Sequence, residues 1–435
     1  MTTCFATSFR NLPSALRRRG FIAFLAVLGL SSLTAVPCAR AQEQASIDTT
    51  SNGDPELEQP KRRLVKWNEY DGPVTTVRFG FGFLTDYAAY SQDEQSKQQF
   101  DLSSDVGVRD FRLLLSGRFK TERPITWSIG YMWDGTDEQW RWRKTGVNFG
   151  IPEISSKLFI GRTKEGYSMV KVMTGYHPWG MERQPSLDFL PILGDGVNLM
   201  TYLEKPRIFT SIGYFSDVLG ENEKFMTANE SVAGRVVWQP ILSEDKSTVL
   251  HIGASGRTFH PDNDVVQIKS RPEDNLSPFF LDTGKMTSKS AQTIGPEIYF
   301  RKGAWLFGSE WNWETVHVEP AGDPTFRGGN FVVTWNITGE TRAYNPSGAF
   351  FAPVSPKKTV FEGGSGAFEA VLTWSYADYN SGAITGGKMW RITPLLNWHM
   401  SDNLRLEFAY GYSKLDRFGF KGGTNFFQAR TQISL

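Results

Sequence analysis

Hydrophobic and polar residues alternate along most of this chain with a period of two. In the segment 404–413, large apolar residues occupy every second position and small, polar or charged residues occupy the others. The segments 77–83 and 125–133 follow the same rule. Successive side chains of a β-strand point to opposite faces, so each segment predicts a strand with one apolar and one polar face. We count about sixteen such segments of about ten residues, the length of a tilted membrane strand.

The connections between these predicted strands also alternate in length. The segments 121–124 and 400–403 are tight turns, whereas 84–105, 217–230 and 258–291 are long and polar. In barrels of the bacterial outer membrane, short turns face the periplasm and long loops face outward. We therefore expect the long connections to lie at the outer end.

The apolar faces of the predicted strands are unusually aromatic. Segments such as 305–313 and 368–376 carry tryptophan, phenylalanine and tyrosine on one face, and a soluble sandwich with such faces would be prone to aggregate. A membrane barrel alternates lipid-facing and interior residues, which explains the negative mean hydropathy of −0.34. No segment after the first fifty residues approaches the length of a membrane helix. The sequence predicts an all-β, antiparallel transmembrane β-barrel in the bacterial outer membrane.

The first 41 residues have the features of an export signal. Arg10 and the basic cluster 17–19 precede the apolar run 21–30, and Ala39-Arg40-Ala41 offers a cleavage site between small residues. We expect cleavage before Gln42.

Cleavage there divides the chain into three parts: a signal peptide (1–41), a polar N-terminal periplasmic segment (42–73) and the barrel domain (74–435). Cys4 and Cys38 lie in the signal, so the mature protein should hold neither a disulfide nor a cysteine metal site. The signal also carries five arginines and no acid, so its removal changes the net charge from +1 to −4. Overall charge therefore gives no support for nucleic-acid binding, and any anion preference must come from the placement of basic groups.

Strand parity assigns a set of charged side chains to the barrel interior. Arginine suits an anion pore, because its planar guanidinium binds phosphate oxygens in pairs and stays charged. The basic set is Arg78, Arg112, Arg118, Arg235, Arg257, Arg301, Arg391, Arg405 and Arg430, and the acidic set is Asp110, Glu297, Glu310, Glu314, Glu369 and Glu407. Pairing of these two sets across neighbouring strands, without selectivity, is the alternative interpretation.

Five further basic residues do not fit this parity or lie near a predicted rim. Arg109 shares the parity of the lipid-facing positions, so it either reaches the outer rim or marks a β-bulge. Arg162 and Lys164 leave the same two alternatives. Arg141 and Arg143 alternate with tryptophans near a short outer turn, which favours a place in the aromatic belt over an entrance funnel.

Several segments, taken in order, resemble the phosphate-selective porin O and P family. The segments are 111–117 and 158–165, Met181-Glu182-Arg183, 280–284, 322–326 and 336–344, the last reading Asn-Ile-Thr-Gly-Glu-Thr-Arg-Ala-Tyr. The resemblance covers nearly all of the chain from about residue 74. It implies a sixteen-stranded barrel, typically a homotrimer, that passes small anions such as phosphate or pyrophosphate.

The resemblance also implies that the third external loop folds inward to narrow the pore. We place that loop at about 166–195, with His177 and Arg183 as its candidate constriction residues. The sequence departs from the family at Asp110, which stands where a second basic group is expected. A general or differently selective porin without phosphate specificity therefore remains the alternative.

Two other classes of function stay open at this point. A hydrolase would need a histidine, a serine and an acid to converge, yet the histidines are scattered and no nucleophile or metal motif is present. His251 and His399 share interior parity, and we interpret them as polar filler rather than catalytic groups. A structural or adhesive barrel would have a blocked interior. We expect no enzyme activity, no cofactor and no metal.

Overall fold

The structure is a computed structural model that describes residues 67–435 apart from 174, 176–177, 220–227 and 319–321. The predicted signal peptide and residues 42–66 of the predicted periplasmic segment lie outside the described residues.

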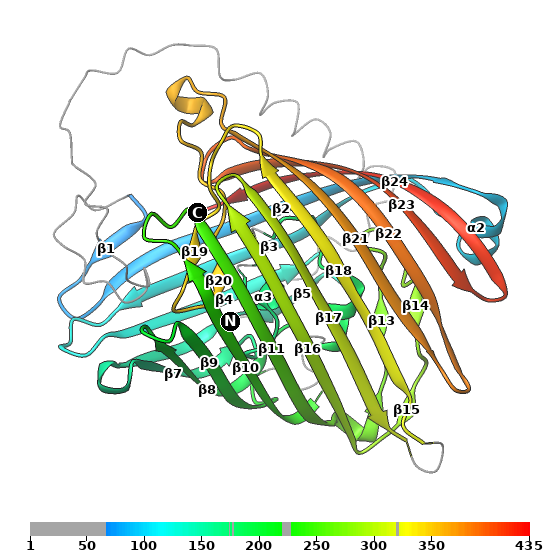
Figure 1. Ribbon diagram of the computed structural model, residues 1–435, viewed down its shortest axis with the longest axis horizontal. Helices are drawn as coiled ribbons and strands as arrows, with labels where there is room; N and C mark the ends of the chain where they lie inside the picture. Colours follow the sequence, from blue (N-terminus) through cyan, green and yellow to red (C-terminus); the bar gives the residue numbers. More distant parts are fainter. Residues whose placement is uncertain (1–66, 174, 176–177, 220–227, 319–321) are drawn as a thin grey trace, which may run out of the picture. The chain divides into compact units, whose positions relative to one another are not determined.

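A closed antiparallel barrel of sixteen strands forms the protein, as the alternation predicts (Figure 1). The wall strands are β2 (Thr76–Gln92), β3 (Asp105–Arg118), β4 (Ile125–Asp134), β5 (Gln139–Trp142) with β6 (Thr145–Ile151) as one interrupted strand, β7 (Ser156–Thr163), β8 (Gly194–Leu203), β9 (Ile208–Ser216), β10 (Ala228–Leu242), β11 (Thr248–Pro261), β16 (Ser290–Lys302), β17 (Trp305–His317), β18 (Thr325–Asn336), β21 (Ala367–Ser381), β22 (Ile384–His399), β23 (Leu404–Arg417) and β24 (Phe420–Ser434). Pairing of β2 with β24 closes the barrel and leaves no open edge.

Side chains alternate across the wall as the sequence predicts. In β23, Phe408 and Tyr410 are 42% and 55% exposed on the outer face, whereas Arg405 and Glu407 are buried inside. The expected strand length of about ten residues holds for β4 and β8, but β10 and β21 to β24 have 14 to 16 residues. The wall from β4 to β9 is therefore shorter than the opposite wall.

Two local irregularities interrupt the alternation. Arg109 is the extra residue of a β-bulge, because Leu84 pairs with Asp110 while Thr85 pairs with Val108. The other lies in β7, where Gly161 has a φ of +130° and the alternation shifts by one residue. Beyond each of these points, side chains therefore lie on the opposite face of the wall from the one that strict alternation predicts.

Long connections occur at both ends of the barrel, so the expectation that they lie only at one end is wrong. We call the end with the turns 119–124, 204–207, 243–247 and 400–403 the turn end and the opposite end the loop end. The loop end carries 93–104, 164–193 and 262–289. Residues 337–366, between β18 and β21, form a long insert at the turn end.

The connections hold the remaining short elements. These are β1 (Glu69–Asp71), α2 (Glu94–Gln99), η1 (Pro152–Ile154), α3 (Met169–Val172), η2 (Pro185–Phe189), η3 (Asp262–Asp264), β12 (Val265–Val266), β13 (Lys269–Ser270), β14 (Leu281–Asp282), β15 (Met286–Thr287), β19 (Tyr344–Asn345), β20 (Phe350–Phe351) and η4 (Val360–Glu362). Among the described residues, no helix is both long and apolar enough to cross a membrane.

Candidate functional site: the constriction inside the barrel

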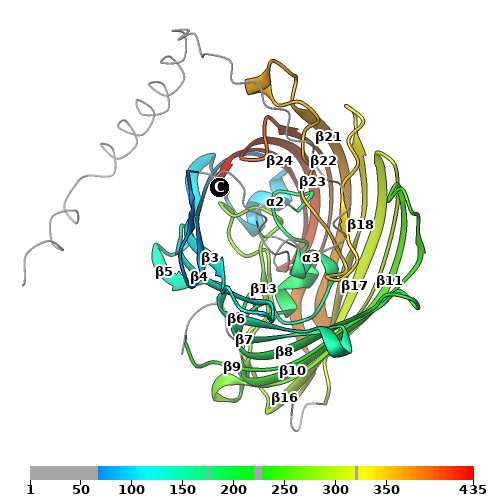
Figure 2. The same cartoon turned by 90° about the vertical axis from the view of Figure 1, so that its left-hand side faces the viewer.

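The 164–193 loop folds into the barrel, and Figure 2 shows its helix α3 inside the ring of strands. Two carboxylates of the long wall hold the start of α3: Glu297 accepts from the Met169 amide at 2.7 Å, and Glu310 accepts from the Val170 amide at 3.0 Å. Further along, the Asn397 amide donates to the Trp179 carbonyl at 3.0 Å. The loop therefore crosses the interior and is fixed to the wall opposite its own strands, as an inward constriction loop requires.

A second segment enters from the loop end. Two wall residues hold this 262–289 loop. The hydroxyl of Tyr90 on β2 is 2.6 Å from the carboxylate of Asp274 in the loop, and Arg391 of β22 donates to the carbonyl of Pro272. The Ser270 hydroxyl also donates to the Pro185 carbonyl at 3.1 Å, which joins this loop to the 164–193 loop. The two loops thus pack against each other inside the half of the barrel nearest the loop end.

The 337–366 insert enters from the turn end. Arg342 donates to Glu369 at 2.7 Å, and both side chains are at most 1% exposed. The Tyr344 hydroxyl is 2.7 Å from Nδ1 of His251, and Arg235 donates to the Ala349 carbonyl at 2.8 Å. Segments from both ends consequently fill the interior beside the long wall.

Four of the predicted interior arginines bind these inserted segments or their anchors. Arg235 donates to Glu297 and Arg257 donates to Glu165, each at distances between 2.6 and 2.8 Å. Arg391 and Arg405 donate to loop carbonyls, and Arg405 also to Glu407. All four are at most 3% exposed. Each guanidinium therefore holds an inserted segment against the wall.

The other predicted wall arginines lie on β2, β3, β16 and β24. Arg301 of β16 is 1% exposed and donates to the Arg342 carbonyl of the 337–366 insert at 2.5 Å, and Arg430 of β24 donates to Asp86 at 2.6 Å. Arg78 is at the turn end, where its half-exposed side chain lies 3.8 Å from Glu69. Arg118 ends β3 and is 8% exposed, and Arg112 lies on the same strand at 5%. The candidate constriction residue His177 lies outside the described residues.

Four cationic side chains face one another where the 164–193 loop passes the short wall. Arg112 and Arg143 both approach the loop: a Cβ atom added at Gly175 would lie 3.1 Å from Nη1 of Arg112 and 3.8 Å from Nη2 of Arg143. Burial lowers the pKa of the nearby Lys164 well below its usual value, and the positive charges of Arg183, Arg143 and Arg112 lower it further. We call Arg112, Arg143, Lys164 and Arg183 the cation cluster.

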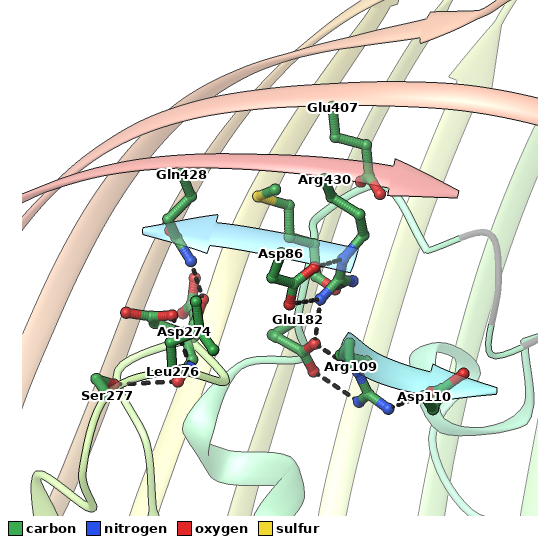
Figure 3. A network of polar contacts seen from close by, with 12 residues as sticks. Asp86, Arg109, Asp110, Glu182, Asp274, Leu276, Ser277, Glu407, Gln428 and Arg430 are labelled. Atoms are coloured by element: carbon green, nitrogen blue, oxygen red, sulfur yellow. Dashed lines mark hydrogen bonds and ion pairs between the residues drawn. The ribbon is translucent and has the colours of Figure 1, made fainter. Parts of the chain in front are cut away.

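A line of alternating charges runs from Arg112 of this cluster along the wall to Arg430 of β24 and Asp86 of β2, and Figure 3 shows its part from Asp110 to Asp86. Asp110 lies 2.6 Å from Arg112 and 2.5 Å from Arg109, so two arginines share its charge. The line consists of Arg112, Asp110, Arg109, Glu182, Arg430 and Asp86 in that order. Asp110 therefore lies between Arg109 and the cluster residue Arg112, and it offsets part of the charge of each.

The sequence of this chain matches a known protein family. The family model for phosphate-selective porin O and P matches residues 77–433. This chain belongs to that family. A relative of uncharacterised function from Caulobacter vibrioides is 31% identical over 182 residues, which is 41% of this chain and 36% of the relative. The match therefore spans about a third of that protein.

Solved structures similar to this porin share its fold. The outer membrane channel DcaP of Acinetobacter baumannii is 9% identical, with a TM-score of 0.54 over 86% of this chain and 100% of that chain. An anion-selective porin from Comamonas acidovorans is 11% identical, with a TM-score of 0.51 over 83% and 100%. The trimer form of OmpT from Vibrio cholerae is 10% identical, with a TM-score of 0.53 over 83% and 100%. Family and fold place this porin in the bacterial outer membrane.

The histidines of the porin do not form a catalytic constellation in the part of the chain that the structure describes. His251 lies 2.9 Å from Glu297, and His399 lies 3.5 Å from Glu369. The exposed His260 and His317 each pair with an acid, and no serine joins any of these pairs. Within the same residues, no group of three or more histidines and acids could hold a metal. Family membership indicates a channel rather than an enzyme.

Parity misplaced Arg143 and left two alternatives for Arg162. Arg143 belongs to the cation cluster rather than the aromatic belt, because the strand breaks between β5 and β6 at residues 143 and 144. Arg162 points inward, is 1% exposed and donates to Asp195 at 2.7 Å, because Gly161 shifts the alternation. The Gly161-Arg162 dipeptide was the signal for this shift, since glycine inside a strand often marks an irregularity.

Proposed function

We propose that this porin allows the passive diffusion of small anions, most of all phosphate or pyrophosphate, through its interior. The cation cluster carries this proposal. Three guanidinium groups and the amine of Lys164, from the wall and from the loop, meet at the constriction, whereas the acids of the long wall are engaged by the inserted segments. An anion crossing there exchanges part of its hydration for guanidinium and ammonium donors.

The neutralisation of Asp110 supports the same conclusion. An acid at this position would repel anions if its charge were directed into the pore, but Arg109 and Arg112 both bind it. Asp110 therefore offsets part of the charge of Arg112, but Arg109 shares that acid, so the departure from the family lowers the positive potential of the cluster without abolishing it. A moderate, distributed attraction also suits conduction, since an anion must be released as well as bound.

We assign two roles to the predicted arginines. Arg112 and Arg183 contact the anion at the constriction, and Arg118 and Arg78 continue the positive path to the turn end. The buried residues Arg235, Arg257, Arg391 and Arg405 hold the inserted segments and add positive potential at longer range. His177 stays part of the proposal as a constriction residue.

Assembly and processing belong to the same proposal. The trimer form of the OmpT neighbour supports a homotrimer in the outer-membrane lipid. Basic residues before an apolar run and a small-residue site support removal of residues 1–41 as a signal peptide.

A general or differently selective porin is the second candidate. The paired charges of the interior favour it, since Arg235 with Glu297 and Arg257 with Glu165 cancel locally. Reversal potentials across a salt gradient separate the two candidates in planar bilayers. We expect a permeability ratio favouring chloride over potassium, together with inhibition of the chloride current by phosphate. A ratio near one, or a chloride current insensitive to phosphate, would refute selectivity, and no conductance at all would favour an adhesive barrel.

A further inference from the structure

Glu182 lies at the point where the constriction loop meets the wall, and its role deepens the function proposed above. Its carboxylate accepts from Nε of Arg109 at 2.8 Å and from Nη2 of the same residue at 3.0 Å. It also accepts from Arg430 at 2.6 Å. Two arginines from β3 and β24, the neighbours of β2 on either side, therefore hold one loop carboxylate (Figure 3).

The wall side of this contact is held by bonds of its own, independent of Glu182. Arg109 reaches the interior because it is the extra residue of the bulge. Arg430 is fixed by two bonds to Asp86 at 2.6 and 2.7 Å, and it also donates to the Met181 carbonyl. Burial raises the pKa of Glu182, but the charges of Arg109 and Arg430 outweigh burial and hold that pKa well below its usual value. The carboxylate is thus an ionised partner for both arginines.

The next residue, Arg183, depends on its neighbour for its position. Its Nε donates to the Val170 carbonyl at 3.3 Å, a long bond. Among the described residues, no carboxylate forms an ion pair with Arg183 within 4.0 Å. Its guanidinium lies near the cations Arg109 and Arg112 and near the acids Glu182 and Asp188. The repulsion between the cations would displace a side chain on a mobile backbone.

We propose that Glu182 is a positioning residue that holds Arg183 in the cation cluster. The carboxylate fixes the backbone at 182, so the side chain at 183 must point toward Arg112 and Arg143. The rest of the loop keeps its other anchors, among them Glu297, Glu310 and Asn397. Loss of the Glu182 contacts therefore moves Arg183 without releasing the loop.

A positioning role and a purely electrostatic role of Glu182 predict opposite changes in anion preference for the substitution Glu182→Gln. Glu182→Gln removes a negative charge from the interior, which by charge alone raises the preference for anions. If Glu182 positions Arg183, the same substitution moves a cation away from the constriction and lowers the preference. Asp188→Asn is the matched control, because Asp188 is an exposed acid of the same loop whose charge also acts on Arg183 but which makes neither of these contacts.

The experiment measures the chloride-to-potassium permeability ratio of the full-length porin in planar bilayers. We expect Glu182→Gln to lower the ratio about two- to five-fold and Asp188→Asn to raise it. Glu182→Asp keeps the charge but shortens the side chain, and it should also lower the ratio. In an Arg183→Gln background, Glu182→Gln should no longer lower the permeability ratio.

Each other outcome overturns the inference. An unchanged or raised ratio in both Glu182 variants means that the residue acts through charge alone, and a decrease that persists without Arg183 means that it acts elsewhere. Glu182→Asp serves as the test if Glu182→Gln fails to fold into a heat-modifiable barrel. The proposed function fails separately, by a wild-type ratio near one, and these variants are judged by their change from wild type.

Discussion

The strength of the cation cluster can be tested by removing one charge at a time. Arg112→Gln and Arg183→Gln each remove a positive charge from the constriction while keeping a long polar side chain. A unit charge about 4 Å from an anion contributes about 1 kcal/mol in bulk water and about 4 kcal/mol at an effective dielectric constant of 20. The pore interior lies between these limits, so we expect each variant to weaken anion binding by about 1–2 kcal/mol.

The two variants should differ in size for a structural reason. Arg112 lies 2.6 Å from Asp110, so its removal also leaves that carboxylate with Arg109 alone. Arg183 has no ion-pair partner among the described residues, and its removal subtracts one charge only. Arg112→Gln should therefore have the larger effect.

The assay is phosphate inhibition of the chloride current through single channels in planar bilayers. A loss of about 1–2 kcal/mol raises the phosphate concentration for half-inhibition by about 5- to 30-fold. Arg123→Gln is the control, because Arg123 pairs with Glu153 on an exposed turn far from the constriction loop. Half-inhibition within about twofold of wild type in both constriction variants would refute the assignment of these residues, since each should cost more than 1 kcal/mol.

Three further measurements probe other parts of the structure. Raising the pH from about 6 to about 9 should lower the preference for chloride over potassium. Burial and the charge of Arg183 lower the pKa of Lys171 to about 7, so its ammonium is charged below that pH and neutral above it. A reversal potential that does not change with pH would contradict this. Glu369→Ala should destabilise the barrel by about 3–5 kcal/mol in denaturant unfolding, because the buried Arg342 loses the carboxylate that balances its charge, and an unchanged midpoint would argue against a buried pair. Gly161→Ala should reduce the yield of folded barrel, because its Cβ would lie 2.3 Å from a backbone oxygen at a φ of +130°, whereas Gly256→Ala, with open space around it, should fold like wild type.

The barrel itself could be predicted because its strands obey a local rule. Residues such as Phe408 and Glu407 take opposite faces wherever the backbone stays regular, and the medium on each side selects their chemistry. The bulge at Arg109 was one of two alternatives that parity left open, and it is confirmed. An irregularity near Arg162 was likewise one of two alternatives, but parity could not place it at Gly161, since a single glycine does not reveal its own φ.

The interior could be predicted only in part, because it depends on contacts between residues far apart in the chain. Parity placed Arg235 and Arg391 inside, but it gave no information on what would face them. Their partners, Ala349 and Pro272, belong to inserted segments from opposite ends of the barrel. Glu182 belongs to a segment that resembles the family, but the sequence did not indicate its partners. Its two arginine partners lie more than 70 residues away in sequence, one on each side.

The 337–366 insert constrains the order in which the protein folds. Its hairpin β19–β20 sits inside a cylinder that closes when β24, the last strand of the chain, pairs with β2, the first wall strand. Residues 337–366 precede β24 in the chain, so the hairpin can dock on β10 and β11 while the sheet is still an open, curved surface. We expect Arg235 and His251 to hold it there before the seam forms, because both lie on the strands that it covers. Filling of the interior and closure of the barrel would then be one process rather than two.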